Sequence, residues 1–276
     1  MRGLRDFDPH PPPRHTNRRG GPAGAECALL LMSKRVAPKR PYWHVSEDEW
    51  YDSVLNHWTS HVSADTDDGV LGGYGAIDEL DAAASLGFAS HWGGRKEGGF
   101  ATGSRALDCG AGIGRVSAGV LAHICENVDL VEVSQPLLDQ AEKNLEHIPC
   151  NRVRFIKESL RTFEPECVSY DVIWLQWVLG HLTDRDVLAL LIRCRHGLRA
   201  GGVVVVKDNN ALPKECIAGR GRYALDEDNA AVIRSYAHMR SLFRQAGLKL
   251  EHVERQTDFP EELCTPQPQS LHPPAP

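Results

Sequence analysis

The chain has 276 residues, of which 42% are hydrophobic, enough for one α/β domain of ordinary size with extensions. No apolar run approaches the roughly 20 residues of a membrane helix, so we expect no membrane partner. Residues 1–41 carry nine Lys and Arg against three acidic residues, whereas the rest of the chain carries 22 against 34. Such an acidic body is a poor binder of nucleic acid and a suitable host for a cationic substrate, although ordinary solubilising charge explains it equally well.

Eight cysteines are scattered along the chain without any C-x-x-C pair. This spacing argues against a zinc site, and several of the cysteines fall in apolar runs, as small buried thiols do. The sequence therefore predicts no metal site and a reducing compartment.

Thirteen of the 17 prolines lie in residues 1–41 and 260–276. We therefore expect disordered tails at residues 1–44 and 263–276 around one folded domain at residues 45–262. The basic pairs at residues 34–35 and 39–40 are compatible with nuclear import, and we expect the protein in the nucleus and the cytoplasm.

The domain is predicted to begin with a helix, because Ser46 and Glu49 form a capping box ahead of apolar residues at helical spacing. Most of this stripe is expected in the core, but Trp58 ends it and is a candidate for lining a pocket. Residues 71–75, LGGYG, then predict a tight loop or lid hinge, and residues 77–92 a second helix. These helices are an N-terminal addition to the domain.

The stretch LDCGAGIGR, residues 107–115, follows a short apolar run and precedes an apolar helix. A strand, a glycine-rich turn and a helix place a nucleotide or nucleoside at the carboxyl end of a sheet. The dinucleotide pattern would need glycine at position 115, where this chain has Arg115. The pattern D-x-G-x-G-x-G instead resembles motif I of class I S-adenosylmethionine (SAM) methyltransferases. Glu132, which closes the next apolar run, suits the ribose hydroxyls of either class of cofactor.

Strand and helix patterns alternate through the rest of the chain. Further strands are predicted at residues 128–133, 153–157, 170–178, 203–209 and 248–255. Helices are predicted after Ser134, from Thr183 to Leu198 and from about Asn229 to Ala246. This alternation predicts a doubly wound, mostly parallel, Rossmann-like sheet.

Polar residues gather where the later strands end, which is where ligands bind in such folds. The candidates are Gln176, Trp177, His181, Asp208, Asn209 and Asn210, together with the acidic cluster 226–229. Helix capping is an equally good explanation of the acidic cluster. His181 lies between a strand and a capped helix, where a core histidine is less expected.

Four stretches together resemble the eukaryotic N-terminal Xaa-Pro-Lys methyltransferases, the protein α-N-methyltransferases. They are DGVLGGYG (68–75), LDCGAGIGR (107–115), YDVIWLQWVLGHLTD (170–184) and VVKDN (205–209). The similarity covers roughly residues 46–262, and WLQWVLGHLTD is its most specific part. It implies a SAM-dependent enzyme that acts on protein substrates beginning with Xaa-Pro-Lys or Xaa-Pro-Arg.

The resemblance also implies residue roles. SAM would be bound by Gly110, Gly112, Arg115, Glu132, Leu160 and Gln176. The peptide channel would be lined by Trp58, Leu71, Trp177, His181 and Asn209. Trp177 would pack on the substrate proline, Arg115 would pair with the SAM carboxylate, and Asp226 with one of Asp228 or Asn229 would face the α-amine and the third-position lysine. His181, or a carboxylate beside it, would accept the proton of the amine, so His181, Asp228 and Asn229 are the catalytic candidates.

The chain departs from the family at three places. Asn229 stands where the family has a second carboxylate, and Asp228 is the candidate replacement. The similarity ends before the aromatic-rich seventh strand of the family and gives way to a Pro-rich tail, which cannot form an inserted strand. We therefore expect the seventh strand to be missing or incomplete at one edge of the sheet. Cys264 stands where the family has a Tyr that would contact the substrate.

We interpret the chain as a monomeric SAM-dependent methyltransferase of free protein α-amino groups. Two alternatives stay open at this point. One is a catalytically weak or inactive SAM-binding isoform, suggested by the altered C-terminus. The other is a methyltransferase of small molecules, which the tryptophan and acidic residues of the predicted channel disfavour.

Overall fold

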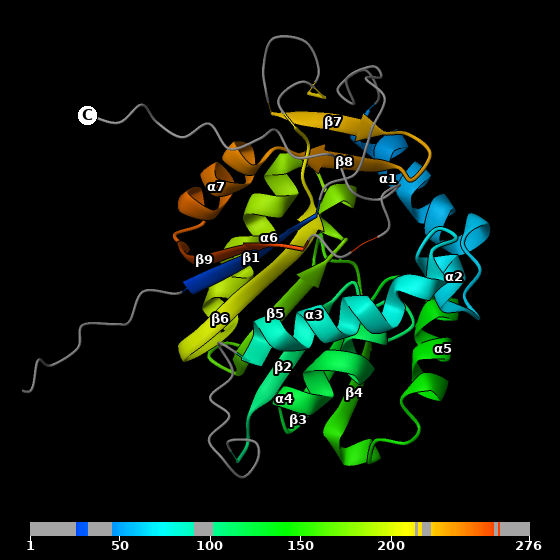
Figure 1. Ribbon diagram of the computed structural model, residues 1–276, viewed down its shortest axis with the longest axis vertical. Coiled ribbons are helices and arrows are strands. Elements are labelled where there is room, and N and C mark those ends of the chain that lie inside the picture. Colours follow the sequence, from blue (N-terminus) through cyan, green and yellow to red (C-terminus); the bar gives the residue numbers. More distant parts are fainter. Residues whose placement is uncertain are drawn as a thin grey trace, which may run out of the picture.

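The computed structural model describes residues 26–32, 46–90, 102–212, 215–216, 222–256 and 259. Its centre is a seven-stranded sheet in the order β4-β3-β2-β5-β6-β1-β9, in which each neighbouring pair is parallel (Figure 1). The strands are β1 (Glu26–Met32), β2 (Arg105–Cys109), β3 (Asn127–Glu132), β4 (Val153–Lys157), β5 (Tyr170–Gln176), β6 (Leu198–Asn209) and β9 (Lys249–Arg255). The expected doubly wound, Rossmann-like sheet is confirmed.

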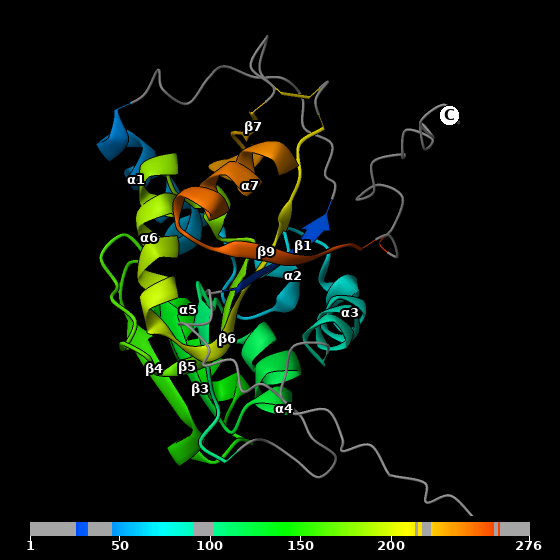
Figure 2. The same ribbon diagram turned by 90° about the vertical axis from the view of Figure 1, so that its left-hand side faces the viewer.

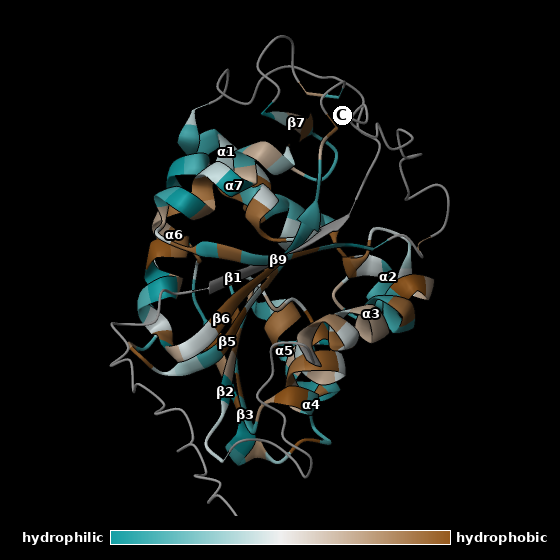
Figure 3. Cartoon of the chain, turned by 60° about the vertical axis from the view of Figure 1, so that its left-hand side comes forward, coloured by the Kyte–Doolittle hydropathy of each residue, from teal (hydrophilic) through white to brown (hydrophobic). Residues whose placement is uncertain are grey.

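Helices cover both faces of the sheet, as Figure 2 shows. One face packs against α6 (Asp184–Gly197) and α7 (Tyr236–Gln245). The other packs against α3 (Asp78–Ser90), the helical turns Ser117–Leu121 and α4 (Ala122–Ile124), and α5 (Gln135–Asn144). Because β5 is covered on both sides, it is apolar almost throughout, and its Trp174 is fully buried. Figure 3 shows this hydrophobic centre along β5 and β6 between the helical layers.

The strand β1 lies within the stretch expected to be a disordered tail. It pairs with β6 from Glu26↔Val203 to Met32↔Asn209 and with β9 along its other edge. It thus occupies an internal position next to the edge strand β9, and the sheet has seven strands although the C-terminus lacks the strand pattern of the family. The predicted absence of the family's C-terminal seventh strand concerns residues 263–276, which lie outside the described residues, so it stays a prediction. The remaining residues of both predicted tails lie outside the described residues.

The acidic cluster near residue 226 does not begin a helix, which corrects a second prediction. It belongs to an antiparallel hairpin of β7 (Tyr223–Asp226) and β8 (Ala231–Arg234). Ala230 adopts a positive φ of 45° in the turn, and the β-branched Val232 and Ile233 suit a strand. The helix begins only after Ser235, whose side chain caps α7.

The N-terminal helices form an addition beside the carboxyl edge of the sheet, as expected. Ser46 and Glu49 make the predicted capping box at the start of α1 (Glu47–Asn56), which continues into a π-helical turn at His57–His61. The short α2 (Asp67–Val70) follows. Trp50 of α1 packs with residues of β7 and β8, which Figure 1 shows lying beside α1. No helix in the described ranges is long and apolar enough to cross a membrane.

Candidate functional site

The glycine loop after β2 has the conformation that its sequence predicts. Gly110, Gly112 and Gly114 all have positive φ, between 55° and 80°, which L side chains rarely adopt. The amides of Gly110 and Ala111 donate to the Val131 carbonyl, at 2.8 and 3.1 Å, which fixes the loop against β3. A Cβ added to Gly112 would meet no protein atom within 4 Å, so the loop backbone is open to close approach by a ligand.

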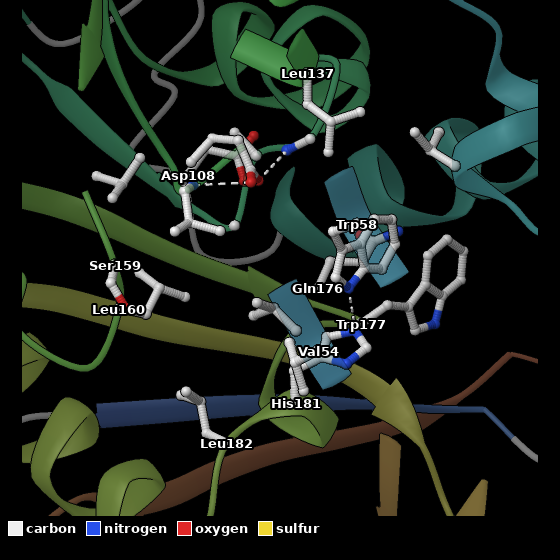
Figure 4. A pocket seen from close by; sticks show the side chains of 18 of the residues that line it. Val54, Trp58, Asp108, Leu137, Ser159, Leu160, Gln176, Trp177, His181 and Leu182 are labelled. Atoms are coloured by element: carbon white, nitrogen blue, oxygen red, sulfur yellow. Dashed lines mark hydrogen bonds between the residues drawn. The ribbon is translucent and has the colours of Figure 1, made fainter. Parts of the chain in front are cut away.

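A cavity of about 400 Å³ lies at this loop (Figure 4). Its walls come from the glycine loop, from the segments that follow β3, β4 and β5, and from α1 with its π-helical extension. The carboxyl ends of parallel strands and the N-terminal helices therefore enclose one site. Apolar side chains form most of its lining, including Val54, Leu137, Leu160 and Leu182.

Glu132 holds the glycine loop to the end of β3. One carboxylate oxygen accepts hydrogen bonds from the amides of Val133 and Ser134, both at 2.8 Å, and the other accepts from Gly112 N at 3.0 Å. Burial raises the pKa of Glu132 in spite of these three donors. Since a carboxylate offers about four acceptor positions, the group retains capacity for a ligand hydroxyl.

Arg115 lines the cavity, and its guanidinium is paired with carboxylates of α3. It donates to Asp78 and to Asp81, the latter at 3.0 Å. Asp81 is 1% exposed, and it also accepts from Gln176 Nε2 at 2.8 Å and from Lys207 Nζ. Two buried cations and a buried amide therefore meet at one carboxylate beneath the site.

Trp177 lines the cavity from an unusual backbone conformation. Its φ of 52° is in the left-handed region, which is strained for a bulky side chain. The Trp177 amide donates to the Lys207 carbonyl at 2.9 Å, so β6 holds the strained residue in place. Strain that the surrounding structure maintains in this way is common at binding sites.

Both ring nitrogens of His181 are engaged, as Figure 4 shows for one of them. The indole N–H of Trp58 lies 3.1 Å from Nε2, and Nδ1 lies 3.0 Å from the Ala230 carbonyl. Since a carbonyl only accepts and an indole N–H only donates, the ring is neutral with its proton on Nδ1. Burial lowers the pKa of His181 to about 4, and the hydrogen bond to Ala230 opposes this shift only in part.

The cavity brings together most of the residues expected at the site. They are Trp58, Leu71, Gly110, Gly112, Arg115, Glu132, Leu160, Gln176, Trp177 and His181. The other expected residues do not line it. Asn209 lies at the end of β6, and Asp226, Asp228 and Asn229 lie on the β7–β8 hairpin, where Asn229 Nδ2 donates to Asp226 at 2.9 Å. The hairpin meets the cavity wall through the hydrogen bond between Ala230 and His181.

Some contributors to the site were not among the expected residues. Tyr51 lines the cavity, and its hydroxyl donates to Asp186 and accepts from Thr183 N at 3.1 Å. Asp108 lines it too; it accepts from Ser117 Oγ at 2.7 Å, and burial raises the pKa of Asp108 to about 7. Asp108 opens the D-x-G-x-G-x-G pattern that predicts the SAM loop, but nothing in the sequence separates Tyr51 from the core residues of its helix.

The chain is similar to known proteins over most of its length. Residues 46–271 match the family described as AdoMet-dependent proline di-methyltransferases. The chain belongs to this family. Among its relatives are N-terminal Xaa-Pro-Lys N-methyltransferase 1 of Rattus norvegicus, 40% identical, and 1-B of Xenopus laevis, 37% identical; each match covers 79% of this chain and 92% of the relative. A SAM-dependent methyltransferase of Leishmania major has a similar structure, with a TM-score of 0.61 and 30% identity over 72% of this chain and 73% of its own.

The cavity of this family member fits S-adenosylmethionine. The open backbone at Gly112 allows close approach, Arg115 offers a cation to the carboxylate, and Glu132 offers acceptor positions to the ribose hydroxyls. The apolar Leu160 and Leu137 line the same space and suit the flat face of a base. These residues would hold the cofactor between the glycine loop and the ends of β3 and β5.

Proposed function

We propose that this protein transfers methyl groups from SAM to the free α-amino group of proteins that begin with Xaa-Pro-Lys or Xaa-Pro-Arg. The relatives named Xaa-Pro-Lys N-methyltransferases, similar over 79% of the chain, support this assignment. The structural observation that best supports the assignment is that Trp58, Trp177 and His181 together line one wall of the SAM cavity. A tryptophan face beside a buried imidazole suits a proline ring whose neighbouring amine must reach the methyl donor.

Bound SAM supplies a methyl group on a positively charged sulfur, which a neutral amine can attack. The chain has to bind the peptide, exclude water and present the amine without its proton. Trp58 and Trp177 would exclude water and take the proline between aromatic faces. The strained backbone of Trp177 fixes the position of its ring before the peptide arrives.

His181 is suited to orient a neutral amine. Its Nε2 carries a lone pair toward Trp58, and an incoming amine N–H can replace the indole as donor at this atom. An α-amine has a pKa near 8, so about a tenth is neutral at pH 7. With its pKa lowered to about 4, His181 stays neutral at that pH and keeps its lone pair for this contact.

The β7–β8 hairpin would contribute the negative charge for the cationic substrate. We propose that Asp226, with its hydrogen bond from Asn229, and Asp228 face the α-amine and the third-position lysine, and that Asp228 serves where the family has a second carboxylate. Asn209, at the end of β6, would contact the peptide backbone. The hairpin lies next to His181, to which the Ala230 carbonyl is hydrogen-bonded.

Mass spectrometry of a Ser-Pro-Lys-Arg peptide incubated with SAM and the protein tests the proposal. Mass gains in steps of one methyl group are expected on the free peptide and not on its α-acetylated counterpart. Binding of SAM by calorimetry without any mass gain would instead favour the catalytically inactive isoform. Methylation of small amines but not of the peptide would favour a small-molecule enzyme.

We also propose a monomer located in the nucleus and the cytoplasm. The basic pairs Lys34–Arg35 and Lys39–Arg40 support nuclear entry; they lie outside the described residues. Fluorescence imaging of the protein with and without neutral substitutions at these pairs tests the location, and light scattering tests the mass in solution.

A further inference from the structure

Arg115, which we assign to the SAM carboxylate, already has two carboxylate partners. Its guanidinium donates to Asp78 and Asp81, residues three apart on the same face of α3. The Arg115 side chain is only 9% exposed. A ligand carboxylate can reach this guanidinium fully only by sharing it with, or taking it from, one of the two aspartates.

The two aspartates differ in how firmly they are held. Asp81 is 1% exposed and is fixed by Lys207 and Gln176 in addition to Arg115. The Asp78 side chain is 32% exposed, and within the described part of the chain its carboxylate accepts a hydrogen bond from Arg115. Asp78 is therefore the carboxylate that can leave.

The balance of charges around Arg115 favours displacement of the Asp78 carboxylate when a ligand carboxylate binds. Arg115 and Lys207 supply two positive charges, and Asp78 and Asp81 supply two negative charges that match them. A third carboxylate at Arg115 would crowd like charges in a poorly solvated space, which is unfavourable. Burial already raises the pKa of Asp78, although Arg115 opposes this shift. Turning outward, Asp78 reaches solvent and stays in the first turn of α3, where the helix dipole stabilises a negative charge.

We propose that Asp78 is a displaceable stand-in for the SAM carboxylate, which competes for Arg115 and so sets the affinity for the cofactor. This inference rests on the proposed use of Arg115 for the carboxylate of SAM. Asp81 stays in place in both states and positions Arg115. Asp78 directly follows the helical turn Gly75–Ile77, so its displacement takes place at the end of the loop whose Leu71 lines the cavity.

Calorimetric titration of Asp78→Asn with SAM and with S-adenosylhomocysteine tests the inference. The substitution removes the competing charge and keeps the size of the side chain. Since a partly exposed ion pair no longer has to be broken, both ligands are expected to bind about two- to fivefold more tightly than to the wild-type chain. Glu79→Gln removes an equal charge from the neighbouring exposed residue and is the matched control, with no change expected.

A second ligand shows whether the effect acts through the carboxylate. Methylthioadenosine lacks the amino-acid part of SAM, so its affinity is expected to be the same for the wild-type chain and Asp78→Asn. Unchanged or weaker SAM binding by Asp78→Asn, or equal tightening of methylthioadenosine, would overturn the inference. These titrations contain no peptide. Their result can therefore be interpreted even if the proposed methyl transfer to peptides fails. A wild-type chain that binds neither SAM nor S-adenosylhomocysteine would overturn both proposals.

Discussion

Replacing His181 with Asn is expected to remove a specific part of the acid sensitivity of this protein. The folded pKa of His181 is about 4, whereas its ordinary value is 6.5. Between these values the unfolded chain binds a proton that the folded chain refuses, so folding stability falls as the pH falls from 6.5 toward 4. The contribution of this one group is absent above pH 6.5, where both states are neutral.

The magnitude follows from the size of the shift. A difference of about 2.5 pKa units corresponds to about 3.4 kcal/mol in full, of which about 2.5 kcal/mol is lost by pH 4.5. His181 is 8% exposed, so solvent screening reduces this figure little. Asn cannot titrate, but its amide can still donate to the Ala230 carbonyl in place of Nδ1.

Urea unfolding at pH 7 and pH 4.5 measures the effect in both proteins. The wild-type chain should lose about 2.5 kcal/mol more than His181→Asn between these conditions. Other groups with shifted pKa values, such as Asp108 and Asp184, are common to both proteins and cancel in the comparison. Equal losses in the two proteins would refute the reasoning, because they would mean that His181 titrates alike in the folded and unfolded states.

Three further predictions concern the fold and the site. Asp81→Asn leaves the buried Lys207 without its counter-charge and should cost about 3–5 kcal/mol of stability, whereas Asp81→Asn combined with Lys207→Met removes the unpaired charge, keeps an acceptor oxygen for Gln176 and should recover part of that loss in thermal unfolding. Leu29→Pro removes a backbone donor from inside the sheet and should cost about 1–3 kcal/mol, whereas Leu29→Val, which keeps the N–H, should cost less; equal melting temperatures would argue against β1. Trp177→Ala should lower kcat/KM for the peptide about 30-fold with a smaller change in the Kd of SAM, and equal losses of both would contradict its assignment to the peptide.

The strands and the glycine loop could be predicted because their signals are local. Gly110 and Gly112 take the positive φ that their residue type allows, and the apolar run of β5 reflects burial on both faces. Ser46 with Glu49 and Thr183 mark the starts of α1 and α6 for the same reason, since a cap needs only residues within one turn.

The two errors have a common physical cause. The acidic cluster at 226–229 has the composition of a helix start, but the chain there pairs as a hairpin that turns through the positive φ of Ala230. The mostly apolar run Glu26–Met32 lies in a proline-rich stretch, and its own sequence does not show which strands it pairs with. Its partners, β6 and β9, follow more than 160 residues later, and strand pairing depends on such distant neighbours.

Local signals in the sequence are enough to predict the class of fold and the glycine loop, and the resemblance of its motifs predicts the family and most of the cavity. How those residues are coupled depends on contacts that form only in the folded chain. Lys207 meets Asp81 across 126 positions, and Trp58 meets His181 across 123. The low pKa of His181 and the occupation of Arg115 by Asp78 result from such contacts, because charge and burial depend on what lies nearby in space and not on what lies nearby in the chain.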